Sequence, residues 1–276
     1  MRVGVLGATG RMGQAVCRAV LQSGDLELAA VVGRSAQLGR ELREIVPEAP
    51  PNLVISGDLS DLISAEVEVV VDFSTPDGTM ALARSCLAEG IHLVSGTTGL
   101  PAGGEQELAG LAGNAGEGNM VWAPNFALGA VLVMHFSAIA ARYYANAEII
   151  EMHHQAKVDA PSGSAIRTAQ AITRARAEGA AGSAAELTGD TGATAPDARS
   201  PARGADIDGV QVHAVRLPGL VAHLEVLFGG QGETLTLRHD SLDRSSFMPG
   251  VLLAVRAVPT TPGLTIGLEP LLGLPG

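Results

Sequence analysis

The chain has 276 residues, 46% of them hydrophobic and 17% charged, which is enough for a sizeable core in one large domain or two modest ones. Its formal net charge of -11 argues against broad nucleic-acid binding, which needs a basic face. The longest apolar stretch, residues 126–141, is shorter than the roughly 20 residues of a membrane span. No signal peptide precedes the first apolar run, so we expect a soluble cytoplasmic protein without nucleic-acid or membrane partners. Cys17 and Cys86 show no disulfide or metal-ligand spacing, and no metal site is predicted.

The N-terminal half alternates short apolar runs with helix-like segments. Thr75 and Pro76 are typical of a helix start, and Gly90 of a helix end. Such strand–helix–strand units, joined by right-handed crossovers, predict a doubly wound parallel sheet, the Rossmann fold. Strands are expected at 3–6, 26–32, 67–73, 91–95 and 120–123, and helices at 12–21, 76–89 and 105–112.

After Pro124 the pattern becomes that of an α+β domain. Residues 177–205 have no apolar period, which is typical of a flexible surface loop. Short turns join the three β-rich runs that follow, which favours an antiparallel meander and a mostly antiparallel sheet. The expected elements are helices at 128–144, from 164 and at 246–258, and strands at 147–153, 210–216, 220–228 and 233–239. The last helix is expected to return to the first domain.

A glycine-rich loop joins the first expected strand to the first helix. Gly7, Gly10 and Gly13 have the spacing G-x-x-G-x-x-G, a variant of the dinucleotide fingerprint. Glycines there allow a tight turn, close approach to a pyrophosphate and close helix packing, while the helix N-terminus attracts the phosphates. A plain glycine turn is the alternative, but the flanking strand and helix favour a dinucleotide site.

The cofactor choice is predicted from the end of the second strand. An acid that binds the ribose hydroxyls normally lies there, but this chain has Gly33 and Arg34. Arg34 can bind a 2′-phosphate, so NADPH is expected to bind at least as well as NADH; the alternative is a solvated surface arginine. Two later loops at strand ends, 96–99 and 123–126, are placed to contact the nicotinamide side, although each alone could be only a turn.

The most informative segment is 151–165. His153 and His154 end an expected strand, and Lys157, the one lysine among 18 basic residues, follows four residues after His153. Ser162-Gly163-Ser164 opens a helix, whose N–H groups form an anion site. We interpret the segment as a carboxylate site beside a proton donor. A structural histidine pair with a serine helix cap is the alternative.

The segment His153-His154 with Lys157-Val158-Asp159-Ala160-Pro161-Ser162-Gly163-Ser164 closely resembles the signature of the dihydrodipicolinate reductase family, also called 4-hydroxy-tetrahydrodipicolinate reductase. Two departures are that Ser164 replaces the usual threonine and that Gly33 stands where many members have an acid. The resemblance extends over nearly the whole chain except 177–205. It also includes Gly7–Gly13, Asp72-Phe73-Ser74, Gly96–Gly99, Ala123–Phe126 and His239–Gly250.

The resemblance implies NADPH- or NADH-dependent reduction of a small cyclic dicarboxylate, 4-hydroxy-tetrahydrodipicolinate, to tetrahydrodipicolinate in the diaminopimelate pathway of lysine biosynthesis. It implies that His153 is a proton donor or acceptor and Lys157 the second proton donor. The implied substrate-binding residues are His154, Ser162, Gly163 and Ser164. The implied cofactor-binding residues are Gly7, Ala8, Thr9, Gly10, Arg11, Met12, Arg34, Gly96, Thr97, Thr98, Ala123, Pro124, Asn125 and Phe126.

The implied domains are a dinucleotide-binding domain (1–126), a substrate-binding and tetramerisation domain (127–238) and a segment that returns to the first domain (239–276). The run 220–228 is apolar on both alternating sets, which indicates an interface, and the resemblance implies a homotetramer joined through this sheet.

Two other classes of protein are the alternatives. Another two-domain reductase, such as a homoserine or sugar dehydrogenase, would need different catalytic residues from those of 153–164. A non-catalytic NADP-binding redox sensor would keep the glycine loop but could dispense with Lys157.

Overall fold

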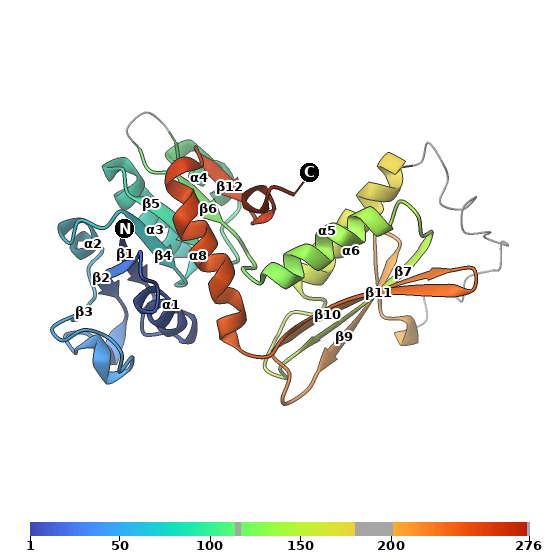
Figure 1. Cartoon of the computed structure of the whole chain (residues 1–276), viewed down its shortest axis with the longest axis horizontal. Helices are drawn as coiled ribbons and strands as arrows, with labels where there is room; N and C mark the ends of the chain where they lie inside the picture. Colours follow the sequence, from blue (N-terminus) through green and yellow to red (C-terminus); the bar gives the residue numbers. More distant parts are fainter. Residues whose placement is uncertain (114–116, 180–200, 275–276) are drawn as a thin grey trace. The chain divides into compact units, whose positions relative to one another are not determined.

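The computed structural model describes residues 1–113, 117–179 and 201–274, which form two compact units. The first unit comprises Met1–Phe126 and Phe247–Gly276, and the second comprises Ala127–Ser246. Figure 1 shows the C-terminal helix α8 (Met248–Ala257) packed beside α1 (Arg11–Leu21), although the two are far apart in the sequence.

The first unit is built on a seven-stranded sheet in which all paired strands are parallel, with the order β12-β6-β5-β4-β1-β2-β3. Its central strands are Val-rich and buried on both faces, as a parallel sheet covered by helices requires. The doubly wound fold predicted from the sequence is confirmed. The strands are β1 (Arg2–Leu6), β2 (Glu27–Val32), β3 (Ile55–Ser56), β4 (Val69–Asp72), β5 (His92–Ser95), β6 (Met120–Trp122) and β12 (Leu264–Ile266).

The helices of this unit follow local sequence signals. In α3, the Thr75 hydroxyl accepts a hydrogen bond from the Gly78 N–H, Pro76 occupies the first turn, and Gly90 ends the following turn with a φ of 77°. These features confirm the predicted start and end. Besides α1 and α8, the α-helices described in this unit are α2 (Ser60–Ser64), α3 (Pro76–Cys86) and α4 (Gly104–Leu111).

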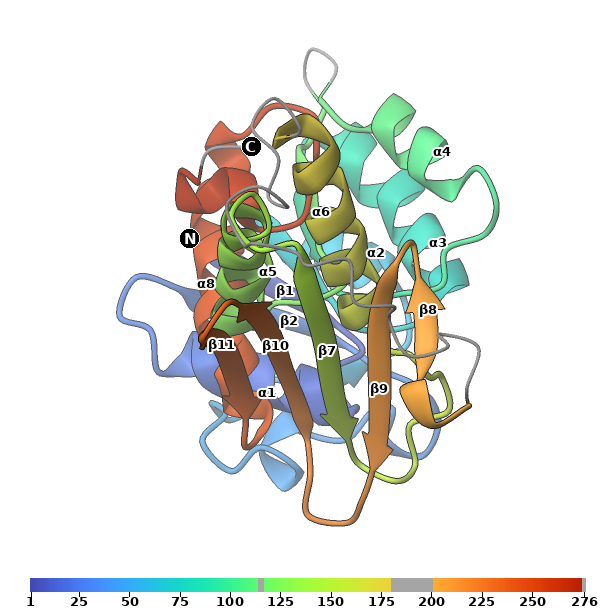
Figure 2. The same ribbon diagram turned by 90° about the vertical axis from the view of Figure 1, so that its right-hand side faces the viewer.

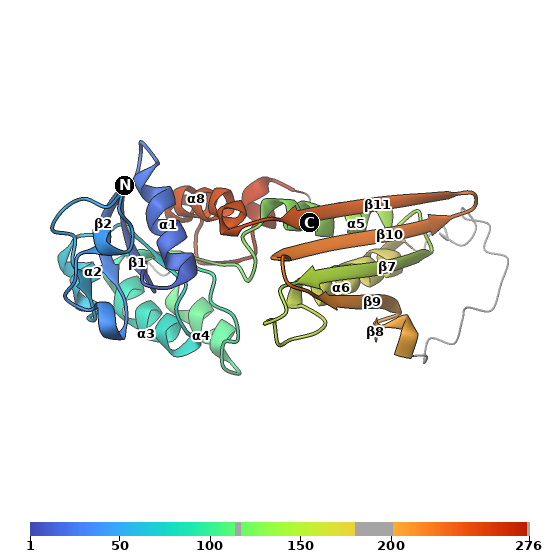
Figure 3. The same ribbon diagram turned by 90° about the horizontal axis from the view of Figure 1, so that it is seen from below.

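The second unit is a five-stranded sheet with the order β11-β10-β7-β9-β8. Helices α5 (Leu128–Ala140) and α6 (Gly163–Gly179) cover one face of it, as Figures 2 and 3 show. No helix in the described part of this unit covers the opposite face (Figure 2). The strands are β7 (Asn146–His153), β8 (Ala205–Ile207), β9 (Val210–Arg216), β10 (Ala222–Gly230) and β11 (Glu233–Ser241).

The predicted three-stranded meander is wrong. Strand β9 does not pair with β10; it pairs in parallel with β7, which therefore lies between β9 and β10. β7 has apolar residues on both faces, including Ile149 and Ile150. A central position, with a neighbouring strand along each edge, shields these residues from water better than an edge position would. The other pairings are antiparallel, so the sheet is mixed but mostly antiparallel, as expected.

Several expected boundaries differ from those of the structure. The helix expected at 128–144 ends at Ala140, and residues 239–241, expected to begin the returning segment, complete β11. Of the predicted loop at 177–205, the first three residues belong to α6, 201–203 form a 3-10 turn and β8 begins at Ala205. Residues 180–200 lie outside the described residues. Within the described ranges, no helix has both the length and the apolar character needed to cross a membrane.

Candidate active site

The first part of the candidate site is a cavity in the first unit, with a volume of about 330 Å³. It lies beside the ends of β1, β2 and β4, where the strand order reverses between β1 and β4. Open α/β sheets bind their ligands at this switch point. The cavity is lined by Leu6, Gly7, Thr9, Gly10, Val32, Gly33, Arg34, Gly57, Leu59, Phe73, Ser74, Thr75 and Gly78.

The β1–α1 loop needs glycine at two positions. Gly7 has a φ of 82°, a left-handed conformation that residues with a side chain rarely adopt. A Cβ on Gly13 would collide with the carbonyl oxygen of Gly7, so glycine allows α1 to start this close to the loop. The helix begins at Arg11 after Gly10, with no side-chain cap on its first amides. The loop and the helix start thus form a backbone cradle suited to a pyrophosphate.

Arg34 lies at the end of β2, on the wall of this cavity. Its Nη2 donates a 2.7 Å hydrogen bond to Thr75 Oγ1, the hydroxyl that also caps α3. A Cβ on Gly33 would overlap the methyl group of Thr9. The wall therefore carries a positive charge at position 34 and has no room for an acid at position 33 unless Thr9 moves.

A buried carboxylate ties together two loops beside the cavity. Asp72, the last residue of β4, is 0% exposed. Its Oδ1 accepts hydrogen bonds from the Ser74 hydroxyl at 2.5 Å and the Ser74 N–H at 3.0 Å. Its Oδ2 accepts from the hydroxyls of Thr79 (2.5 Å), Ser95 (2.7 Å) and Thr97 (3.1 Å). One side chain thereby fixes the start of the β4–α3 connection, α3 itself and the end of β5.

Aromatic residues fix the loops that follow β5 and β6. Trp122 Nε1 donates a 2.8 Å hydrogen bond to the carbonyl oxygen of Thr97. Phe73 and Phe126 meet edge to face with their ring centroids 5.7 Å apart. A Cβ on Gly96 would overlap the Phe73 ring, so this position also needs glycine. Both loops follow neighbouring strands and lie at the same edge of the sheet.

The structure separates the predicted cofactor residues into three groups. Gly7, Thr9, Gly10 and Arg34 line the cavity. Ala8 is fully buried, while Arg11 and Met12 begin α1. The residues after β5 and β6 lie at the same sheet edge without lining this cavity: Gly96, Thr97, Thr98, Ala123, Pro124, Asn125 and Phe126.

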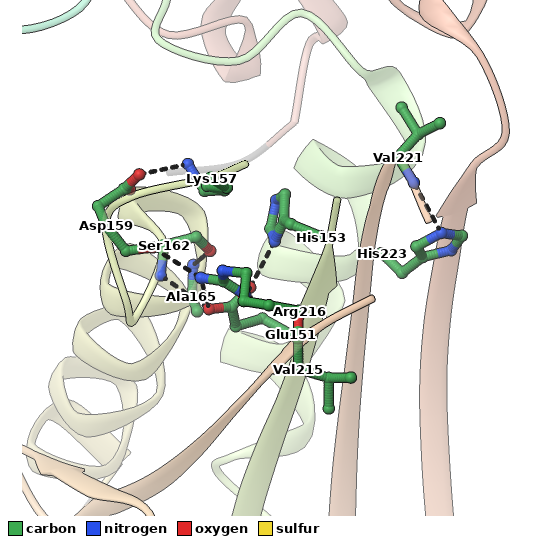
Figure 4. A network of polar contacts seen from close by, with 10 residues as sticks. All are labelled: Glu151, His153, Lys157, Asp159, Ser162, Ala165, Val215, Arg216, Val221 and His223. Atoms are coloured by element: carbon green, nitrogen blue, oxygen red, sulfur yellow. Dashed lines mark hydrogen bonds and ion pairs between the residues drawn. The ribbon is translucent and has the colours of Figure 1, made fainter. Parts of the chain in front are cut away.

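The second part of the candidate site lies at the end of β7, in the second unit (Figure 4). Glu151 and His153 are two residues apart on this strand, so both side chains point to the same face. His153 Nδ1 contacts Glu151 Oε2. Arg216, which is paired with His153 in the register of β7 and β9, donates to both carboxylate oxygens of Glu151, at 2.7 and 2.9 Å. The Ser162 N–H donates to Glu151 Oε1 at 3.2 Å.

Glu151 is ionised inside the fold. Its side chain is 0% exposed, and this burial alone would raise the pKa of its carboxyl group. The hydrogen bonds from His153 and Arg216, together with the charges of these two side chains, outweigh the burial. The pKa of Glu151 therefore lies below its ordinary value.

Lys157 lies in the loop between β7 and α6. Its Nζ donates a 2.8 Å hydrogen bond to Asp159 Oδ1, and its backbone N–H donates to the His154 carbonyl oxygen at 3.0 Å. The hydrogen bond from Lys157 is the main cause that lowers the pKa of the exposed Asp159 carboxyl group. The lysine is thus held within a tight turn that starts directly after His153.

The N-terminus of α6 follows this turn. Ser162 is buried, and its Oγ accepts a 3.3 Å hydrogen bond from the Ala165 N–H, so the serine caps the helix. Gly163 is exposed, and His154 and Ser164 are half-buried. The first N–H groups of a helix have no partner within it and attract anions. The structure therefore places His153 at the end of β7, and His154 and Lys157 on the short connection from β7 to a helix N-terminus.

Sequence reasoning missed three residues of these networks. Glu151 could have been found, because strand alternation places it beside His153. Asp72 was noted only as part of the family resemblance. No local sequence pattern marks Arg216 as a site residue, because its position beside Glu151 depends on the parallel pairing of β7 with β9. In the part of the chain that the structure describes, no three His, Cys, Asp or Glu side chains are grouped to hold a metal ion.

Comparison with known proteins assigns both units to one family. The model for the N-terminus of dihydrodipicolinate reductase matches residues 1–126, and the model for its C-terminus matches 129–272. The 4-hydroxy-tetrahydrodipicolinate reductases of Nocardia farcinica and Streptomyces griseus are each 49% identical to this chain; the matches cover 99% of it and 99% and 98% of those proteins. The dipicolinate-bound dihydrodipicolinate reductase from Paenisporosarcina sp. TG-14 is 38% identical, with a TM-score of 0.80 and 98% of each chain covered. The chain belongs to the dihydrodipicolinate reductase family.

Proposed function

We propose that this chain is an NAD(P)H-dependent 4-hydroxy-tetrahydrodipicolinate reductase of the diaminopimelate pathway to lysine. The relatives named above carry this activity in their names, and the solved relative holds dipicolinate, a ring with two carboxylates. The observation that carries the proposal is the connection between β7 and α6. An imidazole held by a buried carboxylate, the one lysine and a helix N-terminus lie together there.

The start of α6 is the proposed site for a substrate carboxylate. The N–H groups of Gly163 and Ser164 lie at the positive end of this helix, which stabilises an anion. Lys157 and His154 add a charge and a hydrogen-bond donor. Ser162 contributes as the cap that shapes the helix start, because its hydroxyl and its N–H are both used within the fold.

His153 and Lys157 are the proposed proton donors. The nicotinamide, when bound, supplies the hydride. The 4-hydroxyl group of the substrate leaves as water, and the hydride adds to the more unsaturated ring that results. This addition leaves negative charge on the ring, and a nearby acid lowers the barrier by protonating it. His153 lies at the strand end and Lys157 in the turn after it, so both are near the proposed carboxylate site.

The cavity of the first unit is the proposed site for the pyrophosphate and adenosine end of a dinucleotide. Gly7 and Gly13 keep the loop free of side chains, and the uncapped amides that begin α1 would hold the pyrophosphate. Arg34 would hold the adenosine end. The loops after β5 and β6 would hold the nicotinamide end, because both lie at the same edge of the sheet. A cytoplasmic location stays a prediction from the sequence.

Steady-state NADPH oxidation tests the proposed function. The purified chain is expected to oxidise NADPH when freshly made 4-hydroxy-tetrahydrodipicolinate is added, and not with homoserine-pathway or sugar substrates. Binding of NADPH without oxidation by any of these substrates would favour the redox-sensor alternative and contradict the proposal.

The choice between NADPH and NADH is tested at Arg34. Its guanidinium borders the cavity, where it can pair with the 2′-phosphate that NADH lacks. Arg34→Ala is expected to raise the Kd of NADPH by about tenfold or more and that of NADH by much less, since a charge-assisted hydrogen bond contributes roughly 1.5–3 kcal/mol. Titration of both cofactors measures this difference. An equal effect on the two would show that Arg34 does not contact the 2′-phosphate.

The face of the second sheet that lies opposite α5 and α6 is the proposed interface of a homotetramer. Strand alternation and register bring Ile150, Met152 and Val215 together on this face, with Leu227 on the next strand. All four are half-buried within one chain. A second copy that covered them would remove more apolar surface from water, which is the usual source of stability in such assemblies.

Light scattering tests this assembly. The parent chain is expected to have a mass near four times the 28.1 kDa of one chain. Ile150→Arg would place a charge among the half-buried apolar side chains of this face and is expected to reduce the mass to that of a smaller species. The matched control is Ile266→Arg, on β12 of the first unit, which should leave the mass unchanged. A monomeric parent at micromolar concentration would contradict the proposal.

A further inference from the structure

We infer that Glu151 is a positioning residue: it holds the imidazole of His153 in one orientation and one tautomer, with Nε2 presented for proton transfer. The inference rests on the proposed function and extends it to a side chain that need not touch the substrate. Arg216 acts with Glu151 by fixing the carboxylate.

The first support is that the Glu151 carboxylate has no freedom to turn. Arg216 binds both of its oxygens, at 2.7 and 2.9 Å, in the bidentate geometry that gives the strongest and most directional ion pairs. Arg216 is itself fixed by hydrogen bonds to the carbonyl oxygens of Asp159 (2.6 Å) and Val215 (2.8 Å). Figure 4 shows Arg216, Ser162 and His153 converging on Glu151.

The second support is the position of the proton on His153. An ionised carboxylate is an acceptor only, so a hydrogen bond between it and Nδ1 requires the proton to be on Nδ1. The other ring nitrogen, Nε2, is then the one that gains and loses a proton. In the described ranges of the chain, Nε2 of His153 makes no hydrogen bond, while the side chain is 14% exposed.

The third support is charge balance. Glu151 is completely buried, and a lone buried charge would be costly. Arg216 neutralises it, so the pair can remain in place when His153 is neutral. When His153 is protonated, the same carboxylate faces the imidazolium. The same Glu151–Arg216 pair can therefore hold the imidazole both before and after His153 donates a proton.

A purely structural ion pair is the competing explanation. The second unit contains a comparison on the same strand: Glu148 pairs with His213 at 2.7 Å and also contacts Arg203. Glu148 is 36% exposed and lies on the other face of β7. A Glu–His–Arg group alone thus does not define a positioning role, and the test must separate an effect on His153 from an effect on the fold.

A double-mutant cycle on kcat makes this separation. Glu151→Gln keeps one oxygen for Arg216 and Ser162 but turns an amide NH₂ or an uncharged oxygen toward His153 Nδ1. We expect kcat to fall about 10²-fold or more with KM changed little. In a His153→Gln background, Glu151→Gln is expected to lower kcat by less than about threefold, because Glu151 acts through His153. The control Glu148→Gln should keep kcat within about twofold of the parent value.

Additive losses in the cycle, or an equal loss with Glu148→Gln, would overturn the inference and indicate a structural pair. A parent chain without reductase activity would instead overturn the proposed function. Because Glu151→Gln removes a buried charge, it can also fail to fold, and a second measurement avoids that variant and needs no activity.

That measurement is the nitrogen NMR spectrum of the full chain labelled with ¹⁵N-histidine and perdeuterated. His153→Gln identifies the His153 signals. The parent chain is expected to show a proton on Nδ1 of His153 at both acidic and alkaline pH, with only Nε2 changing. A neutral His153 that carries its proton on Nε2 would overturn the inference whatever the kinetic result.

Discussion

Replacing Lys157 with arginine is expected to lower kcat by about 10²–10⁴-fold, the usual contribution of a general acid or base. Arginine keeps the positive charge, and 17 of the chain's 18 basic residues are arginine (18 minus Lys157), so the chain tolerates this residue widely. Arginine cannot release a proton near neutral pH, whereas lysine can. Its wider planar head also fits poorly in the turn where Lys157 Nζ lies 2.8 Å from Asp159. A fall in kcat, rather than a rise in KM alone, would show that Lys157 donates a proton or makes a compact contact in the transition state.

The kinetic measurement needs NADPH binding and folding as controls. NADPH affinity should be nearly unchanged, because Lys157 lies in the second unit and the proposed cofactor cavity in the first. The reverse exchange Arg256→Lys, at an exposed ion pair with Asp25, should leave kcat within about twofold. Near-normal kcat in folded Lys157→Arg would remove Lys157 from the chemistry and leave His153 as the one proposed proton donor.

Replacing Asp72 with alanine is expected to lower the free energy of unfolding by roughly 3 kcal/mol or more and to weaken NADPH binding. Asp72 is fully buried and accepts five hydrogen bonds, from Ser74 (two), Thr79, Ser95 and Thr97. Each buried donor left without an acceptor costs about 1–3 kcal/mol, although some will find new partners. The loops beside the proposed cofactor cavity would lose their common anchor.

Urea unfolding and NADPH titration measure the two effects of this change. Trp122, the one tryptophan of the chain, is a built-in fluorescent probe because its Nε1 is bonded to Thr97, which Asp72 also holds. Asp77→Ala, in the exposed first turn of α3, is the matched control and should cost no more than about 1 kcal/mol. If Asp72→Ala were as stable as this control and bound NADPH normally, the anchoring role of Asp72 would be refuted.

The sequence predicted best those features that local signals determine. The glycines of the β1–α1 loop, the Thr75–Pro76 helix start and the Gly90 helix end each depend on a few neighbouring residues, and each lies where it was expected. Strands β3, β8 and β12 have only two or three residues, which show no periodic pattern of their own, and all three were missed.

The sequence could not predict features that depend on which strands become neighbours. Short turns favoured β9 beside β10, but the sheet places β7 between them. The parallel pairing of β7 with β9 brings Arg216 next to His153. The wrong topology and the failure to identify Arg216 therefore have the same cause. Glu151 is a different case, because its proximity to His153 follows from alternation along one strand and could have been predicted from the sequence.

The proposed reaction transfers a hydride from a nicotinamide cofactor to the ring of 4-hydroxy-tetrahydrodipicolinate, whose 4-hydroxyl group leaves as water. The most direct measurement uses NADPH dideuterated at C4 of the nicotinamide, freshly made substrate and mass spectrometry of the product. The expected product is tetrahydrodipicolinate that carries one deuterium and forms in step with NADPH oxidation, and His153→Gln is expected to suppress its formation strongly. Unlabelled product, or NADPH oxidation that yields no reduced dicarboxylate, would contradict it.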